Sequence, residues 1–114
     1  MLDNCIFCKI GNGEIETEFL YKDDTVCAIN DINPVAPVHI LIFPLEHIDE
    51  IGDEELRGSR WMGHILYVSK KVADLTGIED SGFRIVINQG SDSGQEVQHL
   101  HAHVIGGRPL GSLG

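Results

Sequence analysis

The sequence predicts an α+β fold in which one long helix packs on an antiparallel sheet. Two observations predict this class. Apolar stretches of strand length occur as one pair early in the chain and another near its end, and an amphipathic helix lies between the pairs. With 114 residues, 42% of them hydrophobic, the chain can bury one core but not two. We therefore expect residues 1–114 to form a single domain.

The early pair of strands is expected in FLYKDDTVCAIND, residues 19–31. The polar residues Lys22, Asp23 and Asp24 stand between two short apolar segments, which is typical of neighbouring strands joined by a turn. Cys27 lies inside the second apolar segment, and we interpret it as a small core residue.

A further strand comes after the segment INPVAP, whose two prolines exclude regular helix. This strand, VHILIFPLEH, is stopped by Pro44. Side chains alternate between the two faces of a strand, so the residues before Pro44 divide into two sets. The sets are His39, Leu41 and Phe43 on one face, and Ile40 and Ile42 on the other.

The apolar pattern becomes helical from Asp53 onwards. Its apolar residues recur at steps of three and four, which predicts an amphipathic helix of about six turns. They are Trp61, Ile65, Val68, Val72 and Leu75, widened by Met62, Leu66 and Ala73. We expect Gly52 or Asp53 as the N-cap and Gly77 as the C-terminal stop. His64 lies off this stripe, so its side chain is expected to be solvated.

The late pair of strands is expected in GFRIVINQG and VQHLHAHVI, joined by the turn SDSG. The second of them carries His99, His101 and His103 at alternate positions. Their imidazoles therefore share one face of the strand, about 7 Å apart at Cα. The apolar residues between and after them are expected to pack on the helix; these are Leu100, Ala102 and Val104.

Three alternating imidazoles are suited to two kinds of chemistry. His-x-His on a strand can chelate zinc. Alternatively, one imidazole attacks phosphorus while its neighbours and loop N–H groups neutralise the phosphate oxygens. The loop NQGSDSGQE, residues 88–96, favours the second, since glycines let successive N–H groups face an anion. Composition and spacing leave metal and phosphate chemistry both open.

The charge balance bears on partners and location. Asp and Glu number 18 against 8 Lys and Arg, a net charge of −10, which disfavours binding to nucleic acid polymers or to an anionic membrane. No apolar run reaches the length of a membrane span, and MLDNCIFCKI lacks the features of a signal peptide. We expect a cytoplasmic protein, in which Cys5-x-x-Cys8 is half of a metal site or a redox pair.

The motif HLHAHVI, residues 99–105, resembles the His-φ-His-φ-His-φ-φ signature of the histidine triad (HIT) superfamily of nucleotide hydrolases and transferases. The resemblance covers nearly the whole chain. The opening CIFCKI is similar to the start of these proteins, and INDINPVAPVHILIFPLEHI to their central segment. The GGRP after the triad resembles the Hint branch rather than the Fhit branch.

This resemblance implies the HIT fold, with about five antiparallel strands, one long helix and a short helical segment, and a sheet extended across a homodimer. It implies hydrolysis of purine nucleoside 5′-phosphoramidates and aminoacyl adenylates through a nucleotidyl-histidine, with a small AMP or GMP derivative as substrate and no cofactor required for the chemistry. The alternatives are a dinucleoside polyphosphate hydrolase, a nucleotide-binding or scaffolding protein with incidental turnover, and a metal-dependent hydrolase.

The resemblance also implies roles for individual residues. His101 is the nucleophile, His103 and His39 surround the phosphate, and His99 completes the triad. The implied nucleotide-binding residues are Asp31 for the ribose, Ile29 and Ile32 for the base, and Asn88, Gly94, Gln95, Glu96 and Val97 around the phosphate. Asp31 has an alternative interpretation as a turn residue before Asn33. Glu96 stands where these proteins often carry Ser or Thr, and an ionised carboxylate there would repel phosphate.

Similar bacterial HIT proteins complete a tetrahedral zinc site with two histidines. The corresponding set here is Cys5, Cys8, His47 and His99. Four protein ligands would make such a zinc structural rather than catalytic, and would remove His99 from direct chemistry. The alternative is a pair of reduced core thiols without metal.

Overall fold

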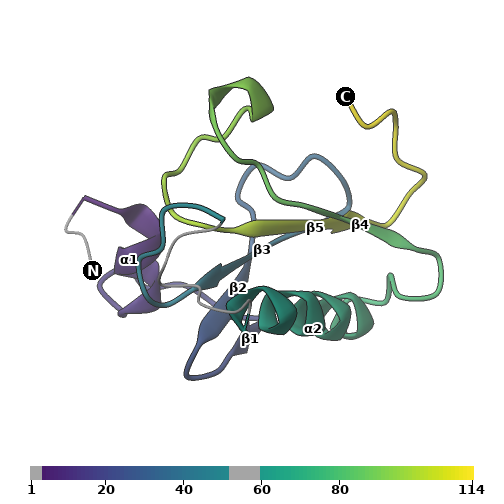
Figure 1. The fold of residues 1–114 in the computed structure, drawn as a ribbon. Helices are drawn as coiled ribbons and strands as arrows, with labels where there is room; N and C mark the ends of the chain where they lie inside the picture. The colour runs from purple at the N-terminus through teal and green to yellow at the C-terminus, as the bar shows by residue number, and fades with distance from the viewer. Residues whose placement is uncertain (1–3, 52–59) are drawn as a thin grey trace.

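The computed structural model describes residues 4–51 and 60–114, which form a five-stranded antiparallel sheet with helices on its two faces (Figure 1). This confirms the expected fold class. In chain order the elements are α1 (Ile6–Gly11), β1 (Tyr21–Lys22), β2 (Val26–Asn30), β3 (Val38–Pro44), α2 (Arg60–Leu75), β4 (Phe83–Val86), the 3-10 turn η2 (Ser91–Ser93) and β5 (Ala102–Gly106). None of these helices is long and apolar enough to cross a bilayer.

The strand order is β1-β2-β3-β5-β4, so β3 lies at the centre and β5, the last strand in the chain, is inserted between β3 and β4. Every neighbouring pair is antiparallel. Leu41 of β3 faces Ile29 of β2 and His103 of β5. Residues near the two ends of the chain are thereby placed next to its middle segment.

Strand alternation separates the core into two layers, one on each face of the sheet. The layer under α2 contains, among others, Val26, Ala28, Ile40, Ile42, Ala102 and Val104. The layer under α1 contains Phe7, Cys8, Cys27, Ile29, Leu41 and Phe43 with their neighbours. The expected division of β3 and the core position of Cys27 are both confirmed. Burial raises the pKa of the Cys27 thiol to about 12.

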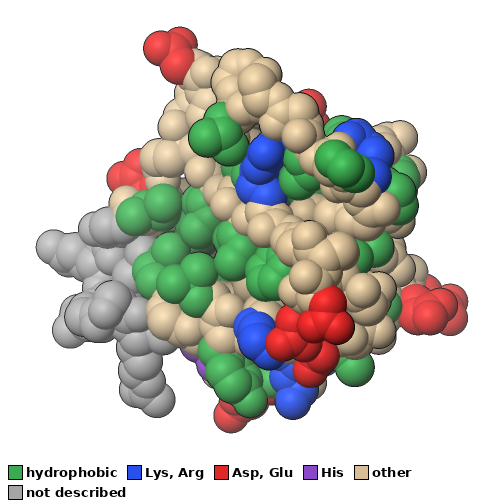
Figure 2. Space-filling view, turned by 90° about the vertical axis from the view of Figure 1, so that its right-hand side faces the viewer, with side chains coloured by type: hydrophobic (Ala, Val, Ile, Leu, Met, Phe, Trp, Pro, Cys, Tyr) green, Lys and Arg blue, Asp and Glu red, His purple; other side chains and the backbone are tan. Residues whose placement is uncertain are grey.

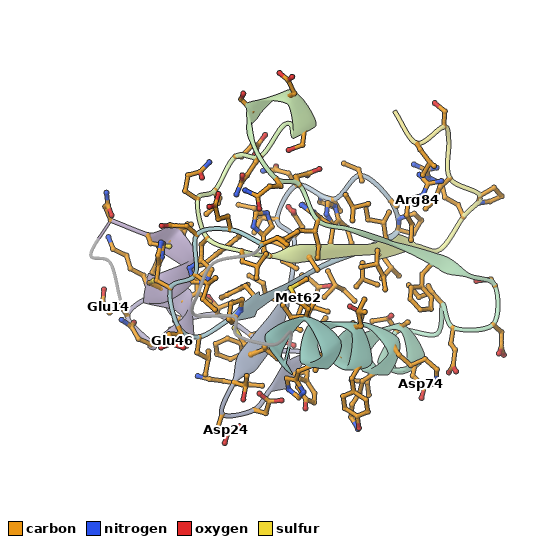
Figure 3. All side chains as sticks on the ribbon, viewed as in Figure 1. Glu14, Asp24, Glu46, Met62, Asp74 and Arg84 are labelled. Carbon is orange, nitrogen blue, oxygen red and sulfur yellow. The ribbon has the colours of Figure 1, made fainter. Side chains whose placement is uncertain are left out.

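The buried stripe of the long helix α2 is narrower than the sequence predicts. Ile65, Val68 and Val72 are fully buried, and Met62 points towards the sheet (Figure 3). Leu66 and Leu75 are instead 53% and 62% exposed, because only about 100° of the helix surface contacts the sheet. The expected N-cap lies outside the described residues, as does the side chain of Trp61. At the other end, Gly77 has φ +78°, the left-handed conformation that ends helices.

The strands of the late pair are shorter than the sequence predicts. The first of them, β4, ends at Val86, and β5 begins only at Ala102. The reason is a different backbone partner for the preceding segment: the N–H of Leu100 donates to Ile48 O at 2.6 Å, outside the sheet ladder. The side chains still alternate, because Leu100 is buried in the α2 layer with Ala102.

Asp23 joins the β1–β2 turn to α2. Its Oδ1 accepts hydrogen bonds from the backbone N–H groups of Thr25 and Val26, both at 2.8 Å. Its Oδ2 accepts from Tyr21 Oη at 2.8 Å and contacts His64 Nε2 at 2.7 Å. The expectation of a solvated His64 is therefore wrong, since its ring is bound to this turn. Burial raises the pKa of Asp23, but these hydrogen bonds, led by Val26 and Thr25, outweigh it and lower the pKa to about 2.

We predict that Asp23→Ala lowers the free energy of unfolding by about 2 kcal/mol at pH 6, since it removes the acceptor of these hydrogen bonds. A carboxyl whose folded pKa is depressed stabilises the protein fully above its unfolded pKa of 3.8, and this contribution is lost as the pH falls through about 2. Urea unfolding of both proteins between pH 6 and pH 2 should show the difference shrinking. Asp24→Ala is the matched control, because the hydrogen bond of exposed Asp24 within the described part of the chain is a single one, accepted from Thr25 Oγ1. An equal loss in the control would contradict the assignment.

Candidate functional site

The candidate site lies on the α1 face of the sheet, where the central strands β3 and β5 meet. The register pairs His39 with Ile105 and Leu41 with His103. His39 and His103 are therefore diagonal neighbours on one face, within reach of each other's side chains. Their rings are joined by a hydrogen bond of 2.9 Å between His39 Nε2 and His103 Nδ1.

The direction of this hydrogen bond is set by the backbone. The N–H of Val35 donates to His39 Nδ1 at 3.2 Å, and an N–H can only donate. Neutral His39 therefore carries its proton on Nε2 and donates it to His103 Nδ1. The proton of neutral His103 is left on Nε2, which makes that nitrogen a donor. Asp31 Oδ2, 3.4 Å from His39 Nε2, favours the same arrangement.

His101 is held in the opposite tautomer, with its proton on Nδ1. Its Nδ1 donates to the backbone oxygen of His99 at 2.7 Å, so Nε2 keeps its lone pair. Phe7 of α1 contacts the His101 ring edge-on, with centroids 5.0 Å apart, and stacks on Phe43 at 4.4 Å. The sequence motifs did not single out Phe7. The signal available was an aromatic residue between the two cysteines, which alone does not say what it covers.

Burial keeps the triad imidazoles neutral. It lowers the pKa of His101, and it lowers the pKa of His103 to about 4, with smaller contributions from the neighbouring His101 and His39 rings. His101 and His103 therefore favour the uncharged form at pH 7. A neutral imidazole with a free lone pair is a nucleophile, and a neutral imidazole with a directed N–H is a hydrogen-bond donor.

Asp31 lies beside His39 and also makes the hydrogen bond expected of a turn residue. Its Oδ1 accepts from the N–H of Asn33 at 2.8 Å, as a turn residue does. Its Oδ2 faces His39. The side chain is 19% exposed, so one carboxylate oxygen lies beside the histidines and remains within reach of a ligand.

The two residues expected to border the base, Ile29 and Ile32, differ in exposure. Ile29 is buried in the core layer under α1, whereas Ile32 is 91% exposed.

Between β4 and β5, Gln95 braces its own loop: its Oε1 accepts from Gly90 N at 2.8 Å and its Nε2 donates to Val97 O at 3.1 Å. Val97 packs on the α1 layer.

The remaining loop residues differ in exposure and conformation. Asn88 is half-buried and Glu96 exposed. Gly94 has φ +86°, a conformation that side chains rarely adopt. The loop is therefore shaped by glycine and by the side chain of Gln95, rather than by contacts of Glu96.

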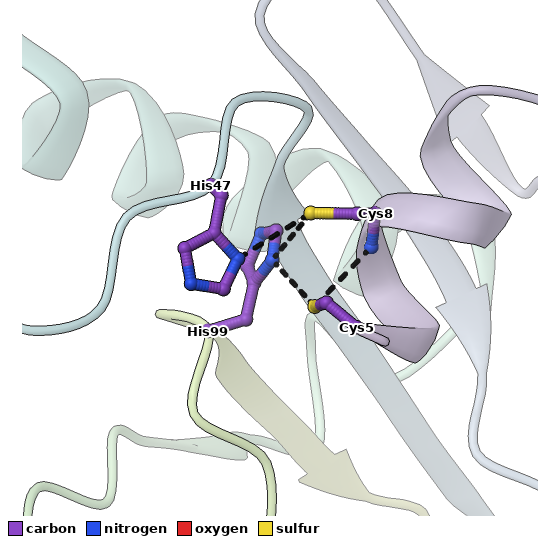
Figure 4. Close-up of side chains that lie close together, drawn as sticks. All are labelled: Cys5, Cys8, His47 and His99. Carbon is purple, nitrogen blue, oxygen red and sulfur yellow. Dashed lines mark hydrogen bonds between the residues drawn. The ribbon is translucent and has the colours of Figure 1, made fainter. Parts of the chain in front are cut away.

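A second cluster lies against the first. The side chains of Cys5, Cys8, His47 and His99 converge from α1, the segment after β3 and the segment before β5 (Figure 4), and their donor atoms all lie within 4.8 Å of one another. His99 Nδ1 is 3.3 Å from Cys5 Sγ and 3.6 Å from Cys8 Sγ. His47 Nδ1 is 3.3 Å from Cys8 Sγ. The long-range convergence implied for these four residues is thus present.

In both His47 and His99, the ring nitrogen that faces away from the thiols, Nε2, already has a hydrogen-bond partner. His99 Nε2 donates to Pro44 O at 2.8 Å, and His47 Nε2 lies 2.7 Å from Asp49 Oδ1. Each ring therefore turns an unprotonated Nδ1 towards the thiols. Two thiols and two such imidazoles are a donor set suited to tetrahedral zinc, and oriented outer nitrogens are the usual support of histidine ligands. The cluster could hold a metal ion.

His99 connects the two clusters. Its ring is fully buried beside the cysteines, with its pKa lowered by burial to about 4, while its backbone oxygen holds His101. The structure thus places the His99 side chain with the cysteines, and the other two triad residues with His39.

A family model described as HIT domain matches residues 12–110. The purine nucleoside phosphoramidase of Escherichia coli (strain K12) is 41% identical over 113 residues, covering 99% of this chain and 95% of that protein. A histidine triad protein from Clostridium difficile has a TM-score of 0.93 with 46% identity, covering 100% of this chain and 99% of that one. A zinc-bound histidine triad family protein from Mycobacterium smegmatis has a TM-score of 0.81 with 29% identity, covering 92% and 76%.

Proposed function

The chain belongs to the HIT domain family, and we propose that it is a purine nucleoside phosphoramidase in which residues 1–114 form one HIT domain. The observation that carries the proposal is the state of His101, whose Nδ1–H is fixed on His99 O and whose Nε2 is left as a free lone pair. The substrates would be purine nucleoside 5′-phosphoramidates and aminoacyl adenylates. The relative named a purine nucleoside phosphoramidase, 41% identical over nearly the full length, supports this substrate class.

In the proposed reaction, His101 Nε2 attacks the α-phosphorus. A nitrogen–phosphorus bond forms while the bond from phosphorus to the leaving group breaks. A phosphoramidate releases an amine, which takes up a proton from solvent, and an aminoacyl adenylate releases the carboxylate of the amino acid. The imidazole becomes positively charged in this step, and its Nδ1–H bond to the His99 oxygen stabilises that charge. Water then attacks the nucleotidyl-histidine, releases the nucleoside monophosphate and restores neutral His101.

The hydrogen-bonded pair of His39 and His103 would act on the phosphate oxygens. His103 offers Nε2–H, and the Val35 N–H and Asp31 both favour that polarity through His39. A donor aimed at charge that develops in the transition state is worth about 3 kcal/mol. His99 would contribute through its backbone, since its ring faces the thiols.

The nucleotide would lie between the 31–35 loop and the 88–97 loop. The Asp31 oxygen facing His39 would accept from the ribose hydroxyls, and Ile29 and Ile32 would border the base. In the second loop the proposed contacts are Asn88, Gly94, Gln95, Glu96 and Val97. Gln95 would act by bracing the loop, and Glu96, being exposed, would contribute its backbone N–H while its carboxylate turns to solvent.

The proposal predicts that His101→Ala lowers kcat on adenosine 5′-phosphoramidate by about a thousandfold or more, because the nucleophile is lost. His64→Ala is the matched control, since His64 is bound to Asp23 and not to the triad; it should keep wild-type activity. Full activity of His101→Ala would reject the mechanism. Lysyl adenylate and diadenosine polyphosphate should be assayed beside it. Faster turnover of the polyphosphate would favour the dinucleoside polyphosphate hydrolase, and nucleotide binding without turnover would favour a scaffolding protein.

We further propose that Cys5, Cys8, His47 and His99 hold a structural zinc ion. The donor atoms and the occupied outer nitrogens support this, as does the zinc-bound relative. With all four ligands from the protein, zinc would tie α1 to the segment before β5 and would supply no reacting group.

Metal analysis of protein purified without chelator should find about one zinc per chain. Cys8→Ser should lose most of this zinc and lower the melting temperature, since one thiolate ligand is removed. Cys27→Ser is the matched control, because Cys27 is a buried cysteine that does not belong to the group of four proposed ligands, and it should retain the metal. Much less than one zinc per chain in the wild-type protein would argue for a pair of reduced core thiols.

We also propose a cytoplasmic homodimer that joins two sheets through β4. This strand is at one edge of the sheet, and apolar surface lies on it and on α2, where Ile85 is 37% and Leu66 53% exposed. Hydrophobic side chains gather on the side of the molecule shown in Figure 2. A second copy would cover both the free strand edge and these side chains.

Sedimentation should accordingly give twice the 12.6 kDa mass of the chain. Ile85→Asp should shift the protein towards monomer, because a carboxylate would be buried in the interface. Ile15→Asp, at a residue of matching 38% exposure in the segment before β1, the strand at the opposite edge of the sheet from β4, should leave the dimer intact. A monomeric wild-type protein, or equal dissociation of the two variants, would refute the arrangement.

A further inference from the structure

The turn after β5 packs tightly on the loop between β2 and β3. At Gly107, with φ +97°, an added Cβ would lie 2.9 Å from Pro37 Cβ, so this approach requires glycine. The next residue, Arg108, donates from Nη2 to Val35 O and from Nη1 to Pro109 O, both at 2.9 Å. Its guanidinium is thereby fixed between two backbone oxygens, one on each segment.

The backbone N–H of Val35 contacts a histidine of the candidate site. Its N–H donates to His39 Nδ1 at 3.2 Å, while its C=O accepts from Arg108. One residue of the loop is therefore held from outside by an arginine and itself holds a histidine of the site. The base of the loop is closed by a separate bond, from Asp31 N to His39 O at 2.9 Å, so the Arg108 contact restrains the middle of the loop.

The position of the proton on the His39 ring sets the direction of the hydrogen bonds that run from His39 through His103 towards the phosphate of the proposed substrate. With Nδ1 occupied by the Val35 N–H, His39 donates from Nε2 to His103 Nδ1, and His103 keeps its proton on Nε2. In the reversed arrangement His39 would carry its proton on Nδ1. His103 would then donate back to it from Nδ1 and turn a lone pair, instead of an N–H, towards a phosphate oxygen.

We propose that Arg108 is a positioning residue for the reaction: by holding Val35 O it keeps the Val35 N–H on His39, and so keeps His103 in the state that donates to the phosphate. This inference rests on the proposed phosphoramidase function. Asp31 favours the same state from the other side of His39. Loss of Arg108 is therefore expected to weaken the arrangement rather than abolish it.

The direct test is nitrogen NMR of the whole protein labelled with ¹⁵N-histidine, without substrate. In the wild-type protein His39 Nδ1 should show the shift of an unprotonated ring nitrogen and His103 Nε2 that of a protonated one. In Arg108→Met, which keeps the apolar length of the side chain but removes its donors, both nitrogens should move towards the average of the two tautomers. Arg108→Lys retains one donor and should restore part of the wild-type pattern.

Arg84→Met is the matched control. Arg84 also donates to a backbone oxygen, that of Gly111 at 3.0 Å, and lies beside the C-terminal tail (Figure 3), yet it makes no bond to the loop among the contacts described. Its imidazole shifts should be those of the wild-type protein. Wild-type shifts in Arg108→Met as well would overturn the proposal. Should Arg108→Met fail to fold, Arg108→Leu, which also lacks the donors to Val35 O, takes its place, and wild-type shifts together with wild-type kcat in that variant would overturn the proposal equally.

Kinetics then connect the tautomer to the reaction. On adenosine 5′-phosphoramidate, Arg108→Met should lose about fivefold in kcat, the effect of one hydrogen bond, with KM changed less than about twofold. A rise in KM at unchanged kcat would indicate a direct contact between Arg108 and the nucleotide, and would overturn the positioning role. If the wild-type protein cleaves no phosphoramidate, the proposed function fails, while the NMR comparison still decides whether Arg108 sets the histidine tautomers.

Discussion

The structure depends on the 2.7 Å hydrogen bond from His101 Nδ1 to the backbone oxygen of His99. This bond leaves the lone pair of His101 on Nε2. The residue that accepts it, His99, also places its own ring against the thiols of Cys5 and Cys8. One short segment therefore carries both the proposed nucleophile, His101, and a member of the cysteine–histidine cluster, His99. This segment leads directly into β5, which is inserted between β3 and β4 and has a hydrogen-bonded partner strand on each side.

Much of this could be predicted from local periodicity. Alternation within β3 assigned Ile40 and Ile42 to the layer under α2, and the same period placed Leu100, Ala102 and Val104 there. Such predictions succeed because burial on one face of a sheet imposes the period directly on the sequence. The convergence of His47 and His99 on the cysteine pair came from resemblance to other proteins, since nothing in the spacing of residues so far apart predicts it.

The features that could not be predicted depend on distances between elements. Phe7 covers His101, His64 binds Asp23, and Arg108 reaches Val35, each across many positions of sequence. The exposure of Leu66 and Leu75 also depends on where α2 meets the sheet rather than on the helical period. Similarly, β5 begins late because Leu100 N has found a partner in Ile48. In each case the type of element follows from the local sequence, but the contacts and exposure of the side chain are decided by tertiary packing.

The short helix α1 has a consequence for where this domain begins. The family match starts at residue 12, so a shortened chain cut there would retain His39, His101 and His103 and would look complete by its signature. It would nevertheless lose the aromatic cover of His101 and both thiols. Water would then reach the ring whose burial keeps it uncharged. The family-model match is thus narrower than the set of residues that surrounds His101, whereas the similarity to the Escherichia coli relative extends over 113 residues, 99% of this chain.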